Sequence, residues 1–300
     1  MRASHVISLE RTHQISPVSR IFDMNSFKSR IRKSVFLFAA ALALPAAGWA
    51  HDFWLAPEAY AVGSPQIVNV SVMIGHPEDR LSWPVAPHRI VSLRTLGPDG
   101  IRDQQAAVLE YKASKNLPIK LEEQGLHILT IETTSSVSIL AGEKFNDYVE
   151  EEGLTPIKID RVIKGTTDKP GRETYSRRGK SLIQVGEMSE IDPPYLTRPL
   201  GLTLEIVPLQ NPARLEAGEI FSSRVYYRGV PISGATIGLI DLDSDDGIFA
   251  LKKTQANGLV EFDRPKAGSW MLHAVWSDPL EESDTADYDT VFSSLSFNIK

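Results

Sequence analysis

From residue 51 onward, short apolar runs alternate with turn-forming residues along the chain. The breaks between the runs contain residues that favour tight turns, as at Gly63-Ser64 and Pro98-Asp99-Gly100. Runs of this length, separated by such turns, are typical of an antiparallel β-sandwich. In the first half, the pattern predicts strands at residues 67–74, 90–93, 107–111 and 127–133.

The second half of the chain has the pattern of a compact sandwich of immunoglobulin-like or transthyretin-like type. Its turns are chemically explicit, as at Ala256-Asn257-Gly258. The strands predicted there are residues 220–227, 236–242, 248–252, 258–262, 269–276 and 291–299. A proline-rich crossing, from Pro193 to Pro212, puts the domain boundary near Pro208. We therefore expect a mainly β protein with two β-sandwich domains, residues 51–208 and 209–300.

One segment departs from the strand pattern. Residues 141–152 carry Phe145, Tyr148 and Val149 at helical spacing, and Gly153 follows where a helix would end. This spacing predicts one short amphipathic helix. The polar stretch at residues 164–180 is rich in Lys, Arg, Thr and Gly, and we interpret it as a solvated loop before a strand at residues 181–185.

The first 50 residues have the composition of a secretory signal. Basic residues at 28–33 precede an apolar run at 34–47, and Gly48-Trp49-Ala50 supplies small residues for cleavage. The run is shorter than the roughly 20 residues that cross a bilayer, which argues against the alternative of a retained anchor. We expect translation to begin at Met24, cleavage after Ala50, and a periplasmic mature chain that begins with His51 and has no membrane span.

Charge and the lack of cysteine narrow the classes of partner. Residues 1–50 contain seven Lys/Arg and two Asp/Glu of the 32 and 38 in the chain, so the mature chain keeps 25 basic and 36 acidic residues, a net charge of −11. Nucleic acid and anionic membrane surfaces are therefore not expected as partners. Because the chain has no cysteine, disulfides and thiolate metal sites are excluded.

His51 is the first candidate for chemistry. Cleavage before it would free an α-amine on the same residue as an imidazole. The amine nitrogen and Nδ1 can then chelate one metal ion, the arrangement called a histidine brace. Such nitrogen donors suit Ni, Co, Cu and Zn better than Ca or Mg.

Hairpin arithmetic gives His76 as the second ligand. If Gly63-Ser64 is a two-residue turn, residues whose numbers sum to 127 face each other, and His51 then lies opposite His76. The competing interpretations are that cleavage before His51 is incidental and that His76 caps a strand end. Three further histidines, His88, His127 and His273, are weaker candidates, and alternation puts His273 on the strand face opposite Trp270 and Trp276.

Other site patterns are lacking in the sequence. The acidic residues at 241–246 differ from a calcium loop because Lys252 occupies the position that needs a bidentate Glu. The sequence contains no G-x-S-x-G elbow, Gly-rich phosphate loop or H-E-x-x-H pattern. We therefore do not expect an enzyme.

Several motifs, in order, resemble the family designated domain of unknown function 4198. They include His51-Asp52-Phe53-Trp54-Leu55, Phe145-Asn146-Asp147-Tyr148, Tyr175-Ser176 with Lys180, Glu205-Ile206-Val207-Pro208 and Ala267-Gly268-Ser269-Trp270. The resemblance implies an exported protein of cobalt or nickel uptake, similar to transporter subunits that bind metal through a chain terminus and a histidine. The chain departs from the family pattern at Trp276, where a histidine is usual, and at Gln255.

We therefore expect a periplasmic protein that binds Ni, Co or Cu through His51 and His76 and serves metal uptake or delivery. Its second partner would be an envelope transporter or receptor component. The alternative is a non-catalytic structural or adaptor protein of the cell envelope. A copper-brace metalloenzyme is a third interpretation, for which the sequence supplies neither a substrate surface nor an acid–base pair.

Overall fold

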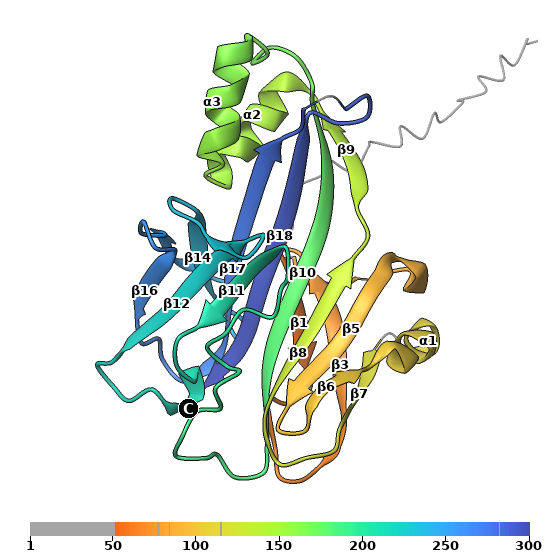
Figure 1. Cartoon of the computed structure of the whole chain (residues 1–300), viewed down its shortest axis with the longest axis vertical. Helices are drawn as coiled ribbons and strands as arrows, with labels where there is room; N and C mark the ends of the chain where they lie inside the picture. The colour runs from red at the N-terminus through yellow and green to blue at the C-terminus, as the bar shows by residue number, and fades with distance from the viewer. Residues whose placement is uncertain (1–51, 77–78, 84, 115, 282) are drawn as a thin grey trace, which may run out of the picture. The chain divides into compact units, whose positions relative to one another are not determined.

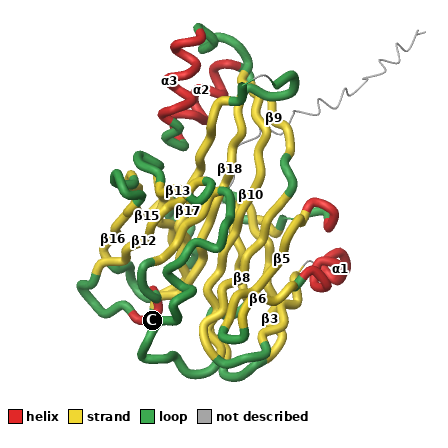
Figure 2. Tube along the Cα trace, in the orientation of Figure 1, coloured by secondary structure: helices red, strands yellow, loops and turns green. Residues whose placement is uncertain are grey.

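The computed structural model describes residues 52–300 apart from residues 77, 78, 84, 115 and 282. The predicted signal segment, its cleavage site and His51 lie outside the described residues. The described residues belong to one compact unit, which is mainly strand, as expected (Figures 1 and 2). None of the described helices is long and apolar enough to cross a membrane.

A long mixed sheet forms the centre of the fold. Within it, the neighbouring strands β10 and β18 run parallel. The other neighbouring strands, in the order given below, are antiparallel. In order across the sheet, the strands are β15 (Ile248–Lys253), β14 (Thr236–Asp241), β17 (Gly268–Pro279), β18 (Tyr288–Ile299), β10 (Gly171–Val185), β8 (Gly125–Thr133), β5 (Ile90–Gly97) and β6 (Gly100–Asp103), with β2 (Ala61–Val62) and β9 (Ser136–Leu140) also paired to β10.

Two smaller sheets pack on this long sheet. The first contains β1 (Phe53–Pro57), β3 (Gln66–Ile74), β4 (Leu81–Ser82) and β7 (Asn116–Leu121). The second contains β11 (Leu204–Pro208), β12 (Ile220–Tyr227), β13 (Val230–Pro231) and β16 (Leu259–Asp263). Each smaller sheet encloses its own apolar core, so the fold contains two β-sandwiches that share one sheet.

The two cores lie on opposite faces of the long sheet. Along β10, Leu182 belongs to the core under the second small sheet, whereas its neighbour Ile183 belongs to the core under the first. Successive side chains of a strand point to opposite faces, so both faces of β10 are buried. The same alternation along β17 sends Trp270 and Leu272 into one core and leaves His273 on the other face.

The predicted helix is confirmed as α2 (Gly142–Glu151), but the expectation of a single helix is wrong. A second helix, α3 (Thr155–Lys164), follows at once, with Pro156 in its first turn. Pro is well suited to that position because its missing N–H would have no helical partner there. Both helices lie beside the end of β17 and the start of β18 (Figure 1).

The strand predicted at residues 107–111 is instead part of a helix, α1 (Gln105–Ser114). Ala107, Val108 and Tyr111 all enter the first core. Their spacing of one and four positions fits a helical face and not strand alternation. Two short 3-10 turns, Pro87–Arg89 and Pro212–Arg214, complete the described helical segments.

The loop expected at residues 164–180 is also partly wrong, because β10 begins at Gly171. Its first half looks solvated in the sequence, yet Glu173, Arg177 and Lys180 are all buried. Each of these polar groups contacts other charged, polar or aromatic side chains within the protein. Because polar residues with partners occupy these buried positions, the sequence lacks the apolar alternation that marks a strand.

The boundary near Pro208 stays a prediction, and the long sheet crosses it, since β10 pairs with β18. A buried ion pair also connects two of the sheets. Lys180 of β10 donates to Glu205 of β11 at 2.9 Å, and both side chains are fully buried. The Glu205 carboxylate also accepts from the backbone N–H groups of Gly201 and Leu202. This buried ion pair joins the long sheet to the second small sheet.

Candidate metal centre

The β1–β3 pair has the predicted register. The two-residue hairpin from which it was counted does not form, because Ala61 and Val62 pair with β10 and not with β3. Phe53 lies opposite Ile74 and Pro57 opposite Val70, so paired residue numbers sum to 127. One step beyond the strand ends, the backbone N–H of Gly75 donates to the carbonyl of Asp52 at 3.0 Å. The predicted pairing of His51 with His76 continues this register, but His51 lies outside the described residues.

The position of His76 is fixed by the residues on either side of it. Gly75 has a φ of 122°, which is the left-handed region that favours glycine. The His76 backbone N–H donates to Asp79 Oδ1 at 2.7 Å, and the Asp79 N–H returns a bond to the His76 carbonyl. Arg80 then donates to the carbonyls of Leu242 and Ser244, which ties this turn to the segment after β14.

Asp52 enters a buried group of charged side chains. It lies on the same face of β1 as Trp54, which packs against Met271 of β17. Asp52 Oδ1 is 3.2 Å from His273 Nδ1, and the other ring nitrogen is 3.6 Å from Glu152 Oε2. Glu152 is the residue that ends α2. The His273 ring therefore lies between two carboxylates that come from different elements.

The electrostatics of this group favour a retained proton. Burial alone would lower the pKa of His273, but the carboxylates of Asp52 and Glu152 raise it to about 9. Burial also raises the pKa of Asp52, an effect that the charges of His273, His76 and Arg80 oppose. At neutral pH the group therefore holds a proton on His273.

A second polar cluster lies beside the first. Thr290 donates to Glu173 at 2.6 Å, the Tyr148 hydroxyl lies 3.4 Å from the same carboxyl, and Ser277 bonds Thr290. Burial raises the pKa of Glu173 to about 7, although the Thr290 and Tyr148 hydrogen bonds lower it. The guanidinium of Arg177 lies over the ring of Trp83, 5.0 Å from its centroid.

The other histidines are apart from this group. His127 is buried in β8, with Nε2 2.8 Å from the Glu123 carbonyl. His88 is exposed in the 3-10 turn at Pro87–Arg89. From the sequence alone, His88 and His127 were as plausible metal ligands as His273, and the local pattern hardly distinguishes the three. Alternation predicts that Asp52 and Trp54 share one face of a strand. It does not predict that this face packs on the strand that carries His273.

Comparison with known proteins gives the chain its family. The model of the family described as "Domain of unknown function (DUF4198)" matches residues 48–278. The chain belongs to this DUF4198 family. Comparison with the curated proteins found no match. Among solved structures, the D0-D1 domain of Intimin is similar at 10% identity and a TM-score of 0.18, over 81% of this chain and 96% of that one. So low a TM-score adds nothing to the fold described above, and the metal-uptake role that the resemblance implied stays a prediction.

The described residues of this DUF4198 chain contain no group of three or more His, Asp or Glu side chains arranged to hold a metal. What they bring together is a pair, Asp52 and His273, with His76 nearby. A metal at this end of β1 would therefore need a donor from outside that pair.

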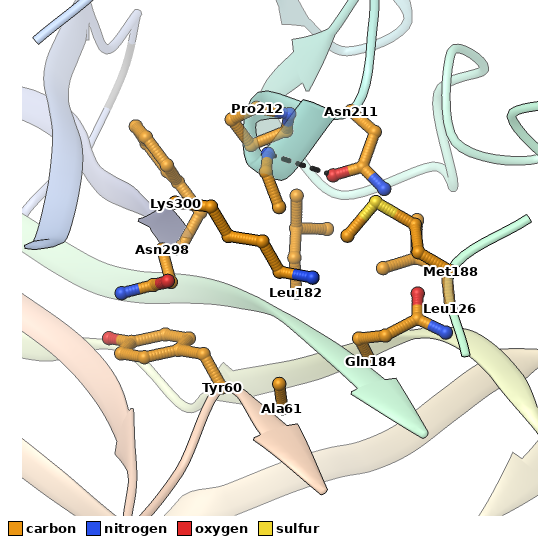
Figure 3. Close-up of a pocket in the computed structure, with 12 residues that line it drawn as sticks. Tyr60, Ala61, Leu126, Leu182, Gln184, Met188, Asn211, Pro212, Asn298 and Lys300 are labelled. Atoms are coloured by element: carbon orange, nitrogen blue, oxygen red, sulfur yellow. Dashed lines mark hydrogen bonds between the residues drawn. The ribbon is translucent and has the colours of Figure 1, made fainter. Parts of the chain in front are cut away.

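A separate hollow in this DUF4198 chain lies among β2, β8, β10 and the last residues of the chain (Figure 3). Its polar lining consists of neutral side chains, among them Tyr60, Gln184 and Asn211, and of the Lys300 ammonium group. Asn211 is already engaged, since its side-chain oxygen accepts from the Ala213 N–H at 3.1 Å. No imidazole or carboxylate side chain lines this hollow, so it offers a metal no donor of the kinds discussed above.

Proposed function

We propose that this DUF4198 chain is a periplasmic protein that binds Ni, Co or Cu and serves metal uptake or delivery. Its ligands are the amine and imidazole of His51, freed by cleavage after Ala50, and the imidazole of His76. A partner in the envelope, a transporter or receptor component, receives or supplies the metal.

The observation that carries this proposal is the register of β1 and β3. Paired residues from 53–74 to 57–70 sum to 127, and the proposal extends this register to pair position 51 with position 76. The hydrogen bonds around Asp79 hold the backbone of His76, so the second ligand is presented from a fixed turn. A preorganised ligand position lowers the entropic cost of binding.

The composition of the site supports a borderline transition metal. The chain has no thiol to compete for the ion. Nitrogen donors favour Cu, Ni, Co and Zn over Ca and Mg. The nearby carboxylates of Asp52 and Glu152 supply negative charge to offset that of the ion.

The test is a titration of protein that begins with His51, using Ni²⁺, Co²⁺ and Cu²⁺ in competition with a chelator of known affinity. We expect binding in the micromolar range or tighter. One extra residue before His51, or His76→Ala, should weaken it at least about tenfold, equivalent to about 1.4 kcal/mol. His88→Ala is the matched control and should bind like the unaltered protein, because His88 is exposed and lies in another turn. If the affinity is unchanged both with an extra residue before His51 and with His76→Ala, the metal binds at another site.

An adaptor role is the second candidate, and the edge strand β15 is the observation that favours it. Ile248, Phe249 and Leu251 are all more than half exposed there, and β15 ends the long sheet. Such an edge can add a strand from another protein. If this is the function, Ile248→Thr with Leu251→Thr should abolish capture of a defined envelope partner, and metal titration should show no binding.

A further inference from the structure

The free edge of the long sheet leads us to propose that two copies of the chain join through β15. The two β15 strands run antiparallel, edge to edge, so that the long sheets of both copies form one continuous sheet across a two-fold axis. This inference goes beyond the proposed function and does not depend on it, because it uses none of the proposed metal ligands.

The first argument is the exposed apolar centre of the strand. β15 ends the long sheet, so one row of its backbone N–H and C=O groups faces no described strand. Its residues Ile248, Phe249 and Leu251 are 51%, 62% and 56% exposed. The ring of Phe249 also packs edge-on against Trp270, with the ring centroids 5.2 Å apart, so it is held in place while most of it faces solvent. An exposed apolar edge of this kind favours association with another strand.

The second argument is the charge at the two ends of β15. Two exposed aspartates, Asp245 and Asp246, lie in the bend just before the strand. Two exposed lysines, Lys252 and Lys253, end it. None of these four side chains forms an ion pair with a described residue, and Lys252 Nζ donates only to the neutral carbonyl of Glu261, at 2.7 Å. The segment is therefore acidic at one end, apolar in the middle and basic at the other end.

This arrangement selects a second copy in the antiparallel direction. Two antiparallel β15 strands set the acidic end of each against the basic end of the other, whereas a parallel pair would set lysine against lysine. Opposite charges across neighbouring strands stabilise the pair, and like charges destabilise it. Residues whose numbers sum to 498 then face each other, which sets Asp246 against Lys252 of the second copy and Phe249 against its own copy. Such a two-fold contact closes on itself, so it gives a dimer and not a filament.

The competing explanation is that the charges only keep other strands away. Lysines and bulges on an edge strand commonly block pairing with unrelated chains, and the β14–β15 pair has a register shift at Leu239–Ile240. A lysine opposes a neutral strand because its charge would lose water, but a second copy brings an aspartate to each basic end. The shift lies toward the Ile248 end and leaves the pairs of Leu251 to Lys253 regular. Charge reversal separates the two explanations.

The experiment is sedimentation velocity on the purified protein over concentrations from about 1 to about 300 μM. We expect dimerisation in the micromolar range, because the contact is at the small end of specific interfaces. Lys252→Asp with Lys253→Asp makes both ends of β15 acidic, and Asp245→Lys with Asp246→Lys makes both ends basic. Each double variant should self-associate at least about tenfold more weakly. An equimolar mixture of the two should dimerise again, since every acidic end then meets a basic one.

A cysteine at position 249 tests the register, because the chain has no cysteine of its own. Directly opposed residues of an antiparallel pair have Cα atoms about 4.5–5.5 Å apart, which a disulfide can span. Under mild oxidation, Phe249→Cys should give a covalent dimer far more completely than Ile191→Cys. Ile191 is the matched control because it is 80% exposed and lies in the segment between β10 and β11.

A dimer that both charge reversals weaken and the mixture restores supports the proposal. A monomer at every concentration would overturn it and leave the edge free for another partner. A dimer that neither reversal weakens, or equal cross-linking of the two cysteine variants, would also overturn it, since the copies would then meet elsewhere. Thermal melting checks that each variant folds. If one double variant does not fold, the other, together with the two cysteine variants, decides the question.

Discussion

Among single side chains, Glu173 has the clearest consequence for stability. Its carboxyl is buried and its pKa is raised to about 7 from an ordinary 4.5. Between those values the folded chain keeps a proton that the unfolded chain has lost. Stability therefore falls as pH rises through this window, by about 2 kcal/mol between pH 5 and pH 7.5 for this one group.

Glu173→Gln should remove this dependence, because the amide resembles the protonated acid and does not titrate. Urea unfolding at pH 5 and pH 7.5 would measure it, with the exposed Glu187→Gln as the control. The fall in unfolding free energy should be about 2 kcal/mol smaller in Glu173→Gln than in the control. Equal falls in the two variants would mean that Glu173 is ionised throughout.

At the scale of elements, the docking of α2 depends on a glycine of β10. A Cβ added at Gly171 would overlap the ring of Phe145, which is the buried centre of the helix contact with Tyr288. Gly171→Ala should destabilise the protein by about 1–3 kcal/mol through overpacking. Gly63→Ala, where a Cβ meets nothing within 4 Å, should change stability by less than about 0.5 kcal/mol. Thermal or urea melts of both variants check this, and a neutral Gly171→Ala would place α2 further from the sheet.

Elements with local signals could be predicted from the sequence, and the others could not. The strand predicted at residues 220–227 coincides with β12, because its alternation ends at an explicit Gly-Val-Pro turn. The helices α1 and α3 were missed for different reasons. The apolar run at residues 107–111 is as short as a strand, and its helical spacing was overlooked. The start of α3 at Thr155 was hidden by the nearby Gly153.

Part of the candidate site could likewise be predicted from the sequence, and part of it could not. Counting across Gly63-Ser64 gave the right β1–β3 register because the two strands are close in the chain, although the segment between them contains β2, which pairs with β10. The contact of Asp52 with His273 joins residues more than two hundred positions apart. No local pattern encodes which strand face meets which, so only the assembled sheets bring these residues together.

For the molecule as a whole, the shared sheet predicts one unfolding transition. Strands of the two predicted domains form the two sides of the long sheet, which meet where β10 pairs with β18, and the buried Lys180–Glu205 pair joins that sheet to the second small sheet. Lys180→Met leaves a buried carboxylate without its cation and should cost about 3–5 kcal/mol. Calorimetry should show one peak that moves as a unit to lower temperature. Two peaks, with one unmoved, would make the boundary near Pro208 a true division.

The central claim is that processing creates the metal site, and native mass spectrometry of the exported protein tests it most directly. The sample would contain the chain that begins with His51 and one that begins with Ala50, loaded together with Ni²⁺ or Cu²⁺. We predict one metal ion on the chain that begins with His51 and at least about tenfold weaker binding to the longer chain, whose α-amine is no longer on a histidine. Equal metal loading of the two chains, or a bare chain that begins with His51, would contradict the account.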